Sequence, residues 1–392
     1  MAKPKKVLVV SYYWPPAGGP GVQRWLKFTK YLPDFGIAPI VYIPENPSYP
    51  IIDEAIVQEV PSGVTVIKQP IKEPYRFASL LSRKQTKSIS SGLVPAQKKQ
   101  NLLQKVLLYI RGNYFVPDAR VGWVKPSVSF LKAYVEKEKI STVITTGPPH
   151  SIHLIGLGLK ERLPKLQWTA DFRDPWTTIG YHDKLKMTAK TQKRHKKLEK
   201  SVLENATQIL VTSPSTKKEF QAITNTPIQV ITNGYDLEEN KSISANAKFT
   251  VSHIGSLLSD RNPKVLWKVL SEIVQSNKAF REAFLLKLAG RISEDVLGSI
   301  REYGLESYLQ LEGYVAHKEA IVMQKSSNVL LLIEIDALQT QSIIPGKLFE
   351  YLASRRPILA IGPQGSDIED VVRSTESGDY CCLLYTSDAA DE

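Results

Sequence analysis

Short apolar runs alternate with amphipathic stretches along most of this chain. Helical spacing is clearest at 265–274, where apolar residues stand at positions 265, 266, 269, 270, 273 and 274. Strands that alternate with helices are typical of parallel, doubly wound sheets. The apolar runs predict strands in two groups, at 7–11, 40–43, 64–67, 142–145, 167–170, 208–212 and 227–231, and at 249–254, 285–289, 309–311, 329–333 and 358–361.

The two groups of strands predict two α/β domains. The turn Asn233-Gly234 and the polar stretch 238–248 between them are typical of a linker. A length of 392 residues is enough for two domains with a core each. We therefore expect an N-terminal domain at 1–240 and a C-terminal domain at 241–381. Residues 382–392 resemble a translated sequencing adapter, so we expect an artefactual tail and a truncated second domain.

Two basic segments stand out in the first domain. The insertion at about 72–125 mixes Lys and Arg with apolar residues, and 100–111 predict an amphipathic helix. Such a helix either lies on a membrane surface or packs on the domain. The densest positive charge, at 184–200, predicts one helix that turns Leu198, Val202 and Leu203 inward. Its charged residues form either a solvated face or a specific contact.

Composition narrows the class of protein. With 42% hydrophobic and 23% charged residues, the chain is typical of a soluble α/β protein. No apolar run approaches the roughly 20 residues of a membrane helix. The basic start reaches Pro15-Pro16 too early for a signal peptide, so we expect a cytoplasmic location. The two cysteines, Cys381 and Cys382, are adjacent and exclude a disulfide framework.

Positive charge is concentrated in the first half. Residues 1–240 carry 35 Lys and Arg against 19 Asp and Glu, whereas residues 241–392 carry 16 against 20. The formal net charge of +12 therefore predicts an anionic partner on the side of the first half. Phospholipid headgroups, a lipid-phosphate acceptor and nucleic acid fit this charge. No nucleic-acid motif is visible, so nucleic acid is not expected.

The segment 345–362 carries the most informative chemistry. A helix is expected to open near residue 345, at the carboxyl edge of a parallel sheet, where free N–H groups and the helix dipole attract anions. Lys347 in the first turn can reach a phosphate, and Glu350 on the same face can accept hydrogen bonds from two ribose hydroxyls. Together they would bind both ends of a nucleoside diphosphate. The alternative is a surface helix with one Lys–Glu pair.

A glycine-rich loop joins the first predicted strand to the first predicted helix. Gly18, Gly19 and Gly21 have the spacing G-G-x-G, whereas the dinucleotide fingerprint is G-x-G-x-x-G, so a nicotinamide cofactor is not expected. Glycines at this place let the backbone approach a ligand closely. The alternative is a tight turn without a ligand.

Polar side chains also follow two later strands. Asp171 and Asp174 come after the strand at 167–170, and His150 comes after the strand at 142–145. The carboxyl ends of parallel strands line the crevice in which α/β proteins bind ligands. The structural alternatives are that Asp174, which precedes Pro175, caps a turn and that His150 packs in the interior.

Together with the G-x-V pattern at Gly313-Tyr314-Val315, these segments resemble the retaining glycosyltransferases of family four over most of residues 5–375. The resemblance implies the GT-B fold, in which two Rossmann-like domains face each other across a cleft. It implies an enzyme that transfers a sugar from a nucleoside diphosphate sugar, with retention, to a saccharide or lipid-linked saccharide in bacterial surface-polysaccharide assembly. Ser342 stands where many members carry a second glutamate.

The resemblance also implies donor-site residues in the second domain. Glu350 would hold the donor ribose, and Lys347 with Arg261 would meet the charge of the diphosphate. Other residues expected around the donor follow the strands of the second half, namely Gly255, Gly290, Arg291, Tyr314 and Val315.

The resemblance also implies that the acceptor binds in the first domain. The glycine loop would border the cleft, Asp171 or Asp174 would polarise the acceptor hydroxyl, and His150 would contact the donor sugar. No metal and no cofactor besides the donor substrate are expected. The pair His150-x-x-His153 has no third ligand near it in the sequence, and no Asp-x-Asp motif is visible.

Two other functions remain open from the sequence. A nucleotide-sugar epimerase on the same fold would need no acceptor, so products formed from the donor alone would identify it. A non-catalytic binder of membrane surfaces or nucleic acid would use the charge of the first half. Its affinity would depend mainly on salt and would be indifferent to nucleotide sugars.

Overall fold

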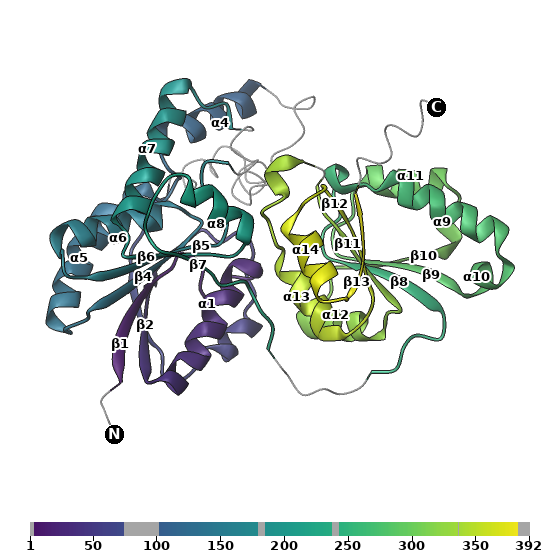
Figure 1. Cartoon of the computed structure of the whole chain (residues 1–392), viewed down its shortest axis with the longest axis horizontal. Helices are drawn as coiled ribbons and strands as arrows, with labels where there is room; N and C mark the ends of the chain where they lie inside the picture. Colours follow the sequence, from purple (N-terminus) through teal and green to yellow (C-terminus); the bar gives the residue numbers. More distant parts are fainter. Residues whose placement is uncertain (1–3, 74–101, 179–184, 237–242, 336, 383–392) are drawn as a thin grey trace. The chain divides into compact units, whose positions relative to one another are not determined.

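A computed structural model describes residues 4–73, 102–178, 185–236, 243–335 and 337–382 (Figure 1). The chain divides into two compact units, Met1–Thr232 (unit 1) and Asn233–Glu392 (unit 2). The predicted domain boundary at residue 240 lies outside the described residues.

Unit 1 is built on a seven-stranded parallel sheet. The strand order is β3-β2-β1-β4-β5-β6-β7, so the chain begins in the middle and builds toward one edge before it crosses to the other. The strands are β1 (Lys5–Val10), β2 (Ile37–Pro44), β3 (Thr65–Gln69), β4 (Thr142–Gly147), β5 (Gln167–Phe172), β6 (Gln208–Val211) and β7 (Ile228–Val230).

Helices cover both faces of this sheet. Because a strand turns successive side chains to opposite faces, Leu8 and Val10 pack with α5 and α6, whereas Val9 packs with α1. Burial on both faces explains why the strands are continuous apolar runs. The helices are α1 (Pro20–Tyr31), α4 (Leu102–Tyr114), α5 (Val124–Lys137), α6 (Ser151–Arg162), α7 (Ala189–Asn205) and α8 (Pro214–Gln221), with short 3-10 helices η1 (Leu32–Phe35), η2 (Ala55–Glu59) and η4 (Val121–Trp123).

Unit 2 repeats this topology in a six-stranded parallel sheet with the order β10-β9-β8-β11-β12-β13. Leu331 and Ile333 pack with α9 and α11, whereas Leu330 and Leu332 pack with α13 and α14. The strands are β8 (Phe249–Ile254), β9 (Phe284–Ala289), β10 (Leu309–Gly313), β11 (Val329–Ile333), β12 (Ile358–Gly362) and β13 (Gly378–Cys382).

The helices of unit 2 are α9 (Lys264–Ser276), α10 (Lys278–Ala283), α11 (Glu294–Glu302), α12 (His317–Ser326), α13 (Gly346–Ser354) and α14 (Asp367–Ser374). Short 3-10 helices are η6 (Ser259–Arg261), η7 (Glu306–Tyr308) and η8 (Leu338–Thr340). The predicted fold class, two doubly wound parallel sheets covered by helices, is confirmed.

The two basic segments of the first half form helices where they are described. The predicted amphipathic helix is α4, although residues 74–101 of the insertion lie outside the described residues. The predicted basic helix is α7, which buries Val202 and Leu203 and half-buries Leu198, while Lys184 is not described. The predicted tail is described only at Cys382, the last residue of β13. None of the described helices combines the length and apolar character needed to cross a membrane.

Candidate functional site

The strand orders locate one topological switch point in each sheet. In unit 1 the order reverses between β1 and β4, and in unit 2 it reverses between β8 and β11. Open α/β sheets bind ligands at such switch points, outside the carboxyl ends of the strands. The sequence-predicted residues Lys347 and Arg261 lie at the switch point of unit 2, and the glycine loop, Asp171 and Asp174 lie at that of unit 1.

In unit 2, two glycines bring Lys347 to the end of β8. Gly255 has φ 131°, and a Cβ atom there would lie 3.5 Å from Lys347 Nζ in the first turn of α13. Gly290 has φ 111°, and a Cβ atom there would meet the Gly255 carbonyl oxygen at 2.5 Å. Both positions therefore need glycine, and together they hold the ends of β8 and β9 beside the Lys347 ammonium.

A buried carboxylate completes this group. Glu334 directly follows β11 and is only 3% exposed. Its Oε2 lies 3.4 Å from Nη2 of Arg261, the last residue of η6. Within the described part of the chain, neither Glu334 Oε1 nor Arg261 Nε has a hydrogen-bond partner. We call Lys347, Arg261 and Glu334 the charged cluster of unit 2.

The side chains of the charged cluster alter one another's titration. Burial, opposed by Glu334 and Glu350 and reinforced by Arg261, lowers the pKa of Lys347 overall to about 8. Burial also raises the pKa of the Glu334 carboxyl, although Arg261 and Lys347 oppose this shift. The pKa of His253, inside β8, lies well below its ordinary value because of burial and then of Lys347. Two neighbouring cations that are largely removed from water form a strong site for an anion.

Glu350 lies one turn further along α13 and is held from α12. Its Oε1 is 3.1 Å from His317 Nε2, and its Oε2 accepts a hydrogen bond of 2.9 Å from Gln324 Nε2. Burial raises the pKa of the Glu350 carboxyl, but the hydrogen bonds from His317 and Gln324 outweigh it and lower the pKa overall. The carboxylate is therefore charged and oriented, with a third of its side chain exposed.

The other predicted donor residues lie further from these charges. Arg291 is exposed after β9, and Tyr314 is 85% exposed after β10. Val315 is half-buried against the apolar cluster beneath α13. Among the described residues, no contact joins Arg291 or Tyr314 to the charged cluster, so their predicted contacts with a donor stay predictions.

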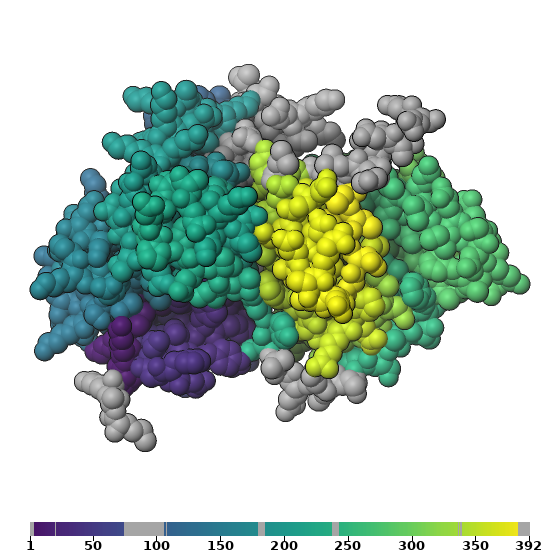
Figure 2. Space-filling view, viewed as in Figure 1, coloured from purple at the N-terminus to yellow at the C-terminus, as the bar shows by residue number. Residues whose placement is uncertain are grey.

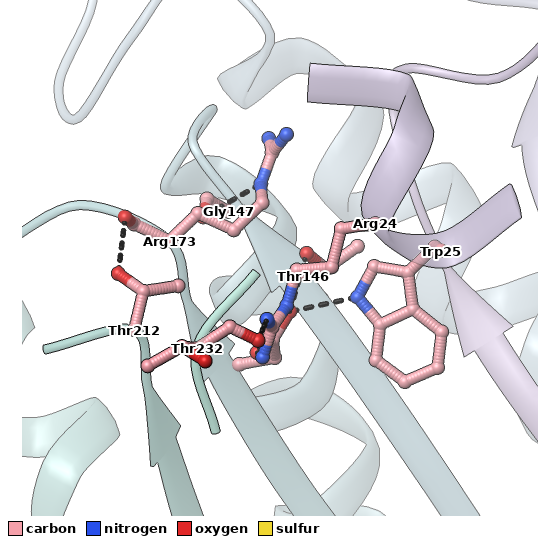
Figure 3. Close-up of polar contacts among 8 residues, drawn as sticks. Arg24, Trp25, Thr146, Gly147, Arg173, Thr212 and Thr232 are labelled. Carbon is pink, nitrogen blue, oxygen red and sulfur yellow. Dashed lines mark hydrogen bonds and ion pairs between the residues drawn. The ribbon is translucent and has the colours of Figure 1, made fainter. Parts of the chain in front are cut away.

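In unit 1, Asp171 is fully buried at the centre of a polar group. Figure 3 labels its partners Arg24, Trp25 and Thr146. Asp171 Oδ1 receives a hydrogen bond of 2.9 Å from Arg24 Nη2. Its Oδ2 receives bonds of 2.7 Å from Trp25 Nε1 and 2.8 Å from Thr146 Oγ1. Arg24 also donates to the backbone oxygen of Thr232 at 2.9 Å. This group ties α1, β4 and β5 to the last residue of unit 1.

The protonation of Asp171 follows from these donors. Burial raises the pKa of its carboxyl, but the charge and hydrogen bonds of Arg24, with Trp25 and Thr146, lower it overall. Both oxygens are occupied by donors of unit 1, so the geometry is that of an anchor for α1. A role of Asp171 in polarising an acceptor stays a prediction that these contacts do not favour.

Arg173 connects the predicted loops. Its Nη1 donates to the Gly21 backbone oxygen at 2.5 Å, its Nε donates to the Gly147 oxygen at 3.2 Å, and its Nη2 donates to the Pro148 oxygen. A Cβ atom at Gly21 would lie 2.9 Å from Arg173 Nη1, so glycine makes room for the guanidinium. The glycine loop and the loops after β4 and β5 are thus joined at one edge of the sheet.

Asp174 is a half-buried carboxylate at the same edge of the sheet, directly after Arg173. Burial raises the pKa of its carboxyl, and Arg173 partly offsets the shift. A carboxylate with a raised pKa is a better proton acceptor than one that is held by strong donors, as Asp171 is. Asp174 therefore fits the predicted role in polarising an acceptor hydroxyl better than Asp171 does.

His150 lies in the interior at the start of α6. It is 3% exposed, and its ring stacks on Trp176 with 4.9 Å between centroids and 3° between planes. His153 contacts Thr145 Oγ1 through Nδ1 at 3.0 Å, and burial lowers its pKa to about 3. In the described ranges, no group of three or more His, Cys, Asp or Glu side chains is placed to hold a metal ion.

Some members of these groups were not singled out from the sequence. Glu334 had a local signal, because it is the charged residue that ends the apolar run 329–333. Arg24, Gln324 and His317 had none, since each acts on a residue at least 26 positions away in the sequence.

The comparisons with known proteins fit this architecture. No protein-family model and no curated protein matches the chain. A glycosyltransferase from Rickettsia africae has a TM-score of 0.57 at 12% identity, and the match covers 97% of this chain and 84% of that one. WaaG, a glycosyltransferase involved in lipopolysaccharide biosynthesis, has a TM-score of 0.52 at 12% identity, with 96% and 86% covered.

A third solved structure, from E. coli, is described as trehalose-6-phosphate bound with UDP-2-fluoro glucose. Its TM-score is 0.56 at 10% identity, with 94% of this chain and 87% of that chain covered. At such low identities the similarity establishes the architecture and leaves the activity open. Two parallel α/β units with this shared strand order give the chain the GT-B fold of these glycosyltransferase structures.

Proposed function

We propose that this protein is a glycosyltransferase that transfers a sugar from a nucleoside diphosphate sugar with retention of configuration. The observation that carries the proposal is the charged cluster at the switch point of unit 2. Lys347 and Arg261 flank the end of β8 and the N-terminus of α13, where an incoming diphosphate finds two cations and free N–H groups.

Glu350 extends this site toward a ribose. Its carboxylate is charged, half-buried and oriented by α12, and it lies three residues after Lys347 on the same helix. A fixed carboxylate accepts hydrogen bonds from two adjacent hydroxyls, so Lys347 and Glu350 would bind the two ends of a nucleoside diphosphate. The UDP-sugar analogue bound in the similar E. coli protein is consistent with such a donor.

The proposed reaction needs no group beyond the two substrates. The acceptor oxygen bonds to the anomeric carbon on the face that the leaving group departs from, and the bond from that carbon to the phosphate oxygen breaks. The acceptor proton passes to the departing diphosphate. Lys347 and Arg261 stabilise the charge that develops on that diphosphate; donors of this kind typically contribute about a hundred- to thousandfold each. Asp174 in unit 1 would polarise the acceptor hydroxyl.

We further propose a saccharide or lipid-linked saccharide acceptor of surface-polysaccharide assembly, and a place at the cytoplasmic face of a membrane. In unit 1, Asn113 of α4 binds the start of α7 through Thr188 N at 2.8 Å and Thr191 Oγ1 at 2.9 Å. The two helices lie beside each other, as Figures 1 and 2 show. Helix α4 exposes an apolar stripe of Val106, Tyr109, Ile110 and Tyr114. Helix α7 exposes the basic residues Lys190, Lys193, Arg194, Lys196, Lys197 and Lys200. Basic and apolar side chains together suit an anionic bilayer.

Donor binding is the first test. Isothermal titration with a panel of nucleoside diphosphates and their sugars should show binding of one base, and Lys347→Ala should weaken it about tenfold or more. Lys268→Ala, which changes an exposed residue of α9, is the matched control and should bind as the unchanged protein does. If no nucleoside diphosphate binds, the proposal is wrong.

Products then separate the enzyme classes. Incubation with the bound donor alone should leave the sugar unchanged apart from slow hydrolysis, and acceptor saccharides should be glycosylated with the anomeric configuration of the donor, as followed by proton NMR. Conversion of the donor sugar without any acceptor would instead identify an epimerase.

A further inference from the structure

We propose that Glu334 is a positioning residue for the diphosphate site: a built-in counter-ion that aligns Arg261 and Lys347 while the site is empty and weakens the hold on the diphosphate after transfer. This inference rests on the proposed donor site and assigns a role to a residue that the resemblance to family four did not single out.

The backbone holds Glu334 in place at the switch point. Its N–H donates to the Ile361 carbonyl oxygen at 2.8 Å, which continues the pairing of β11 with β12. Gly362 packs against it, since a Cβ atom there would lie 3.3 Å from Glu334 Cβ. With a side chain only 3% exposed, the carboxylate lies in the interior rather than in the solvent.

The contact of Glu334 with the cations is loose. Its ion pair with Arg261 spans 3.4 Å and leaves the Arg261 side chain 29% exposed, whereas the fully buried pair of Arg24 and Asp171 in unit 1 spans 2.9 Å and is supported by further donors. Glu334 Oε1 and Arg261 Nε have no hydrogen-bond partner among the described residues. A buried donor and a buried acceptor without hydrogen-bond partners destabilise the protein. A ligand that supplies such a partner would therefore bind favourably.

A bound diphosphate would improve the contacts of the two cations but not those of Glu334. Its oxygens can take the unpartnered N–H of Arg261 and the ammonium of Lys347. Glu334 cannot leave, and it then stands as a like charge close to the phosphates. The Glu334 carboxylate therefore stabilises the two cations in the empty site and weakens the binding of the diphosphate, which favours release of the product nucleotide.

Removing the charge of Glu334 should thus strengthen the binding of nucleotide. In titration calorimetry we expect Glu334→Gln to bind the nucleoside diphosphate about tenfold more tightly than the unchanged protein, or about 1.4 kcal/mol. Glu272→Gln, an exposed glutamate of α9, is the matched control and should bind normally. Glu334→Met, also neutral and of similar length, serves if the glutamine variant does not fold. Unchanged or weaker binding in a folded neutral variant overturns the inference.

A second measurement needs no nucleotide. The titratable and charged groups around Lys347 are Glu334 after β11, Arg261 in η6, Glu350 on α13 itself and the neutral imidazole of His253 in β8. Because Glu334 raises the pKa of Lys347, its neutral variants should lower it from about 8, as followed by the pH dependence of Lys347 acetylation in mass spectrometry. An unmoved pKa refutes the counter-ion role. If the pKa moves but no nucleotide binds, the donor-site proposal fails and the counter-ion role stands.

Discussion

Lys347 shows at the residue scale how burial prepares a side chain for an anion. Its ammonium has left most of its water, and a neighbouring guanidinium repels it, so its pKa falls to about 8. A bound diphosphate would replace the lost solvation. Binding should therefore favour the protonated form, and the two equilibria should be coupled.

This coupling predicts a pH dependence for nucleotide binding. Lys347 is charged below pH 8 and loses its proton as the pH rises through 8, so affinity should decline above that value. Because the bound anion raises the pKa of Lys347, the protein should take up protons on binding near pH 8. Calorimetry in two buffers of different ionisation enthalpy measures that uptake, and Lys347→Met should abolish it. Proton release, or no exchange, would contradict the predicted role.

Glu350 tests the ribose end of the site. Glu350→Gln should weaken nucleotide binding by about 1.5–3 kcal/mol, because hydrogen bonds to a charged group are lost, while the melting temperature stays nearly constant. The unchanged protein should prefer a ribonucleotide over its 2′-deoxy form, and the variant should lose this preference. Glu302→Gln, exposed on α11, is the control. A variant that still distinguishes the two sugars would place the ribose elsewhere.

At the scale of secondary-structure elements, the contacts of Asp171 join α1, β4 and β5. Arg24 and Trp25 are on α1, and Thr146 is on β4, so the carboxylate holds the helix of the glycine loop against the sheet. Asp171→Asn should destabilise unit 1 by about 3–5 kcal/mol, since it leaves the Arg24 charge buried without its anion. Urea unfolding measures the loss, with exposed Asp34→Asn as control. A loss below about 1 kcal/mol would show that the pair is not an anchor.

The α4–α7 surface is the second test at this scale. Lys193→Glu with Lys197→Glu, and separately Tyr114→Ser, should reduce co-sedimentation with vesicles that contain anionic phospholipid. Lys165→Glu and Phe35→Ser are the matched controls, because both lie exposed elsewhere in unit 1. Neutral vesicles should bind less, and salt should weaken binding. Equal binding by the variants and their controls would remove the proposed membrane contact.

The elements themselves follow largely from local pattern. Strands buried on both faces need continuous apolar residues, and the predicted run 329–333 coincides with β11 for that reason. The helix opening after Pro345 was predictable from its motif, and α13 begins at Gly346. The residue at which a unit ends does not follow from local pattern, because polar composition marks a linker but not the exact boundary within it.

At the scale of the whole molecule, two units repeat one topology, and each puts its polar residues at the same kind of place. The switch point of unit 2 carries the charged cluster, and the switch point of unit 1 carries the glycine loop and the Asp174 edge. Similarity to GT-B structures extends over more than nine tenths of the chain at 10–12% identity. A fold depends on the spacing of apolar residues along the chain, and many different sequences share the same spacing.

The sequence by itself determined the α/β class, the two sheets and the placement of Lys347 and Glu350 on one helix, because each of these depends on residues within a few positions of one another. The tertiary structure decided which charges meet. Arg261 and Glu334 are 73 positions apart, and Arg24 and Asp171 are 147 apart. Only the strand order brings such residues together, since crossovers place distant segments at one sheet edge. The same packing decided that Asp171 is an interior anchor and that Asp174 keeps an accessible carboxylate.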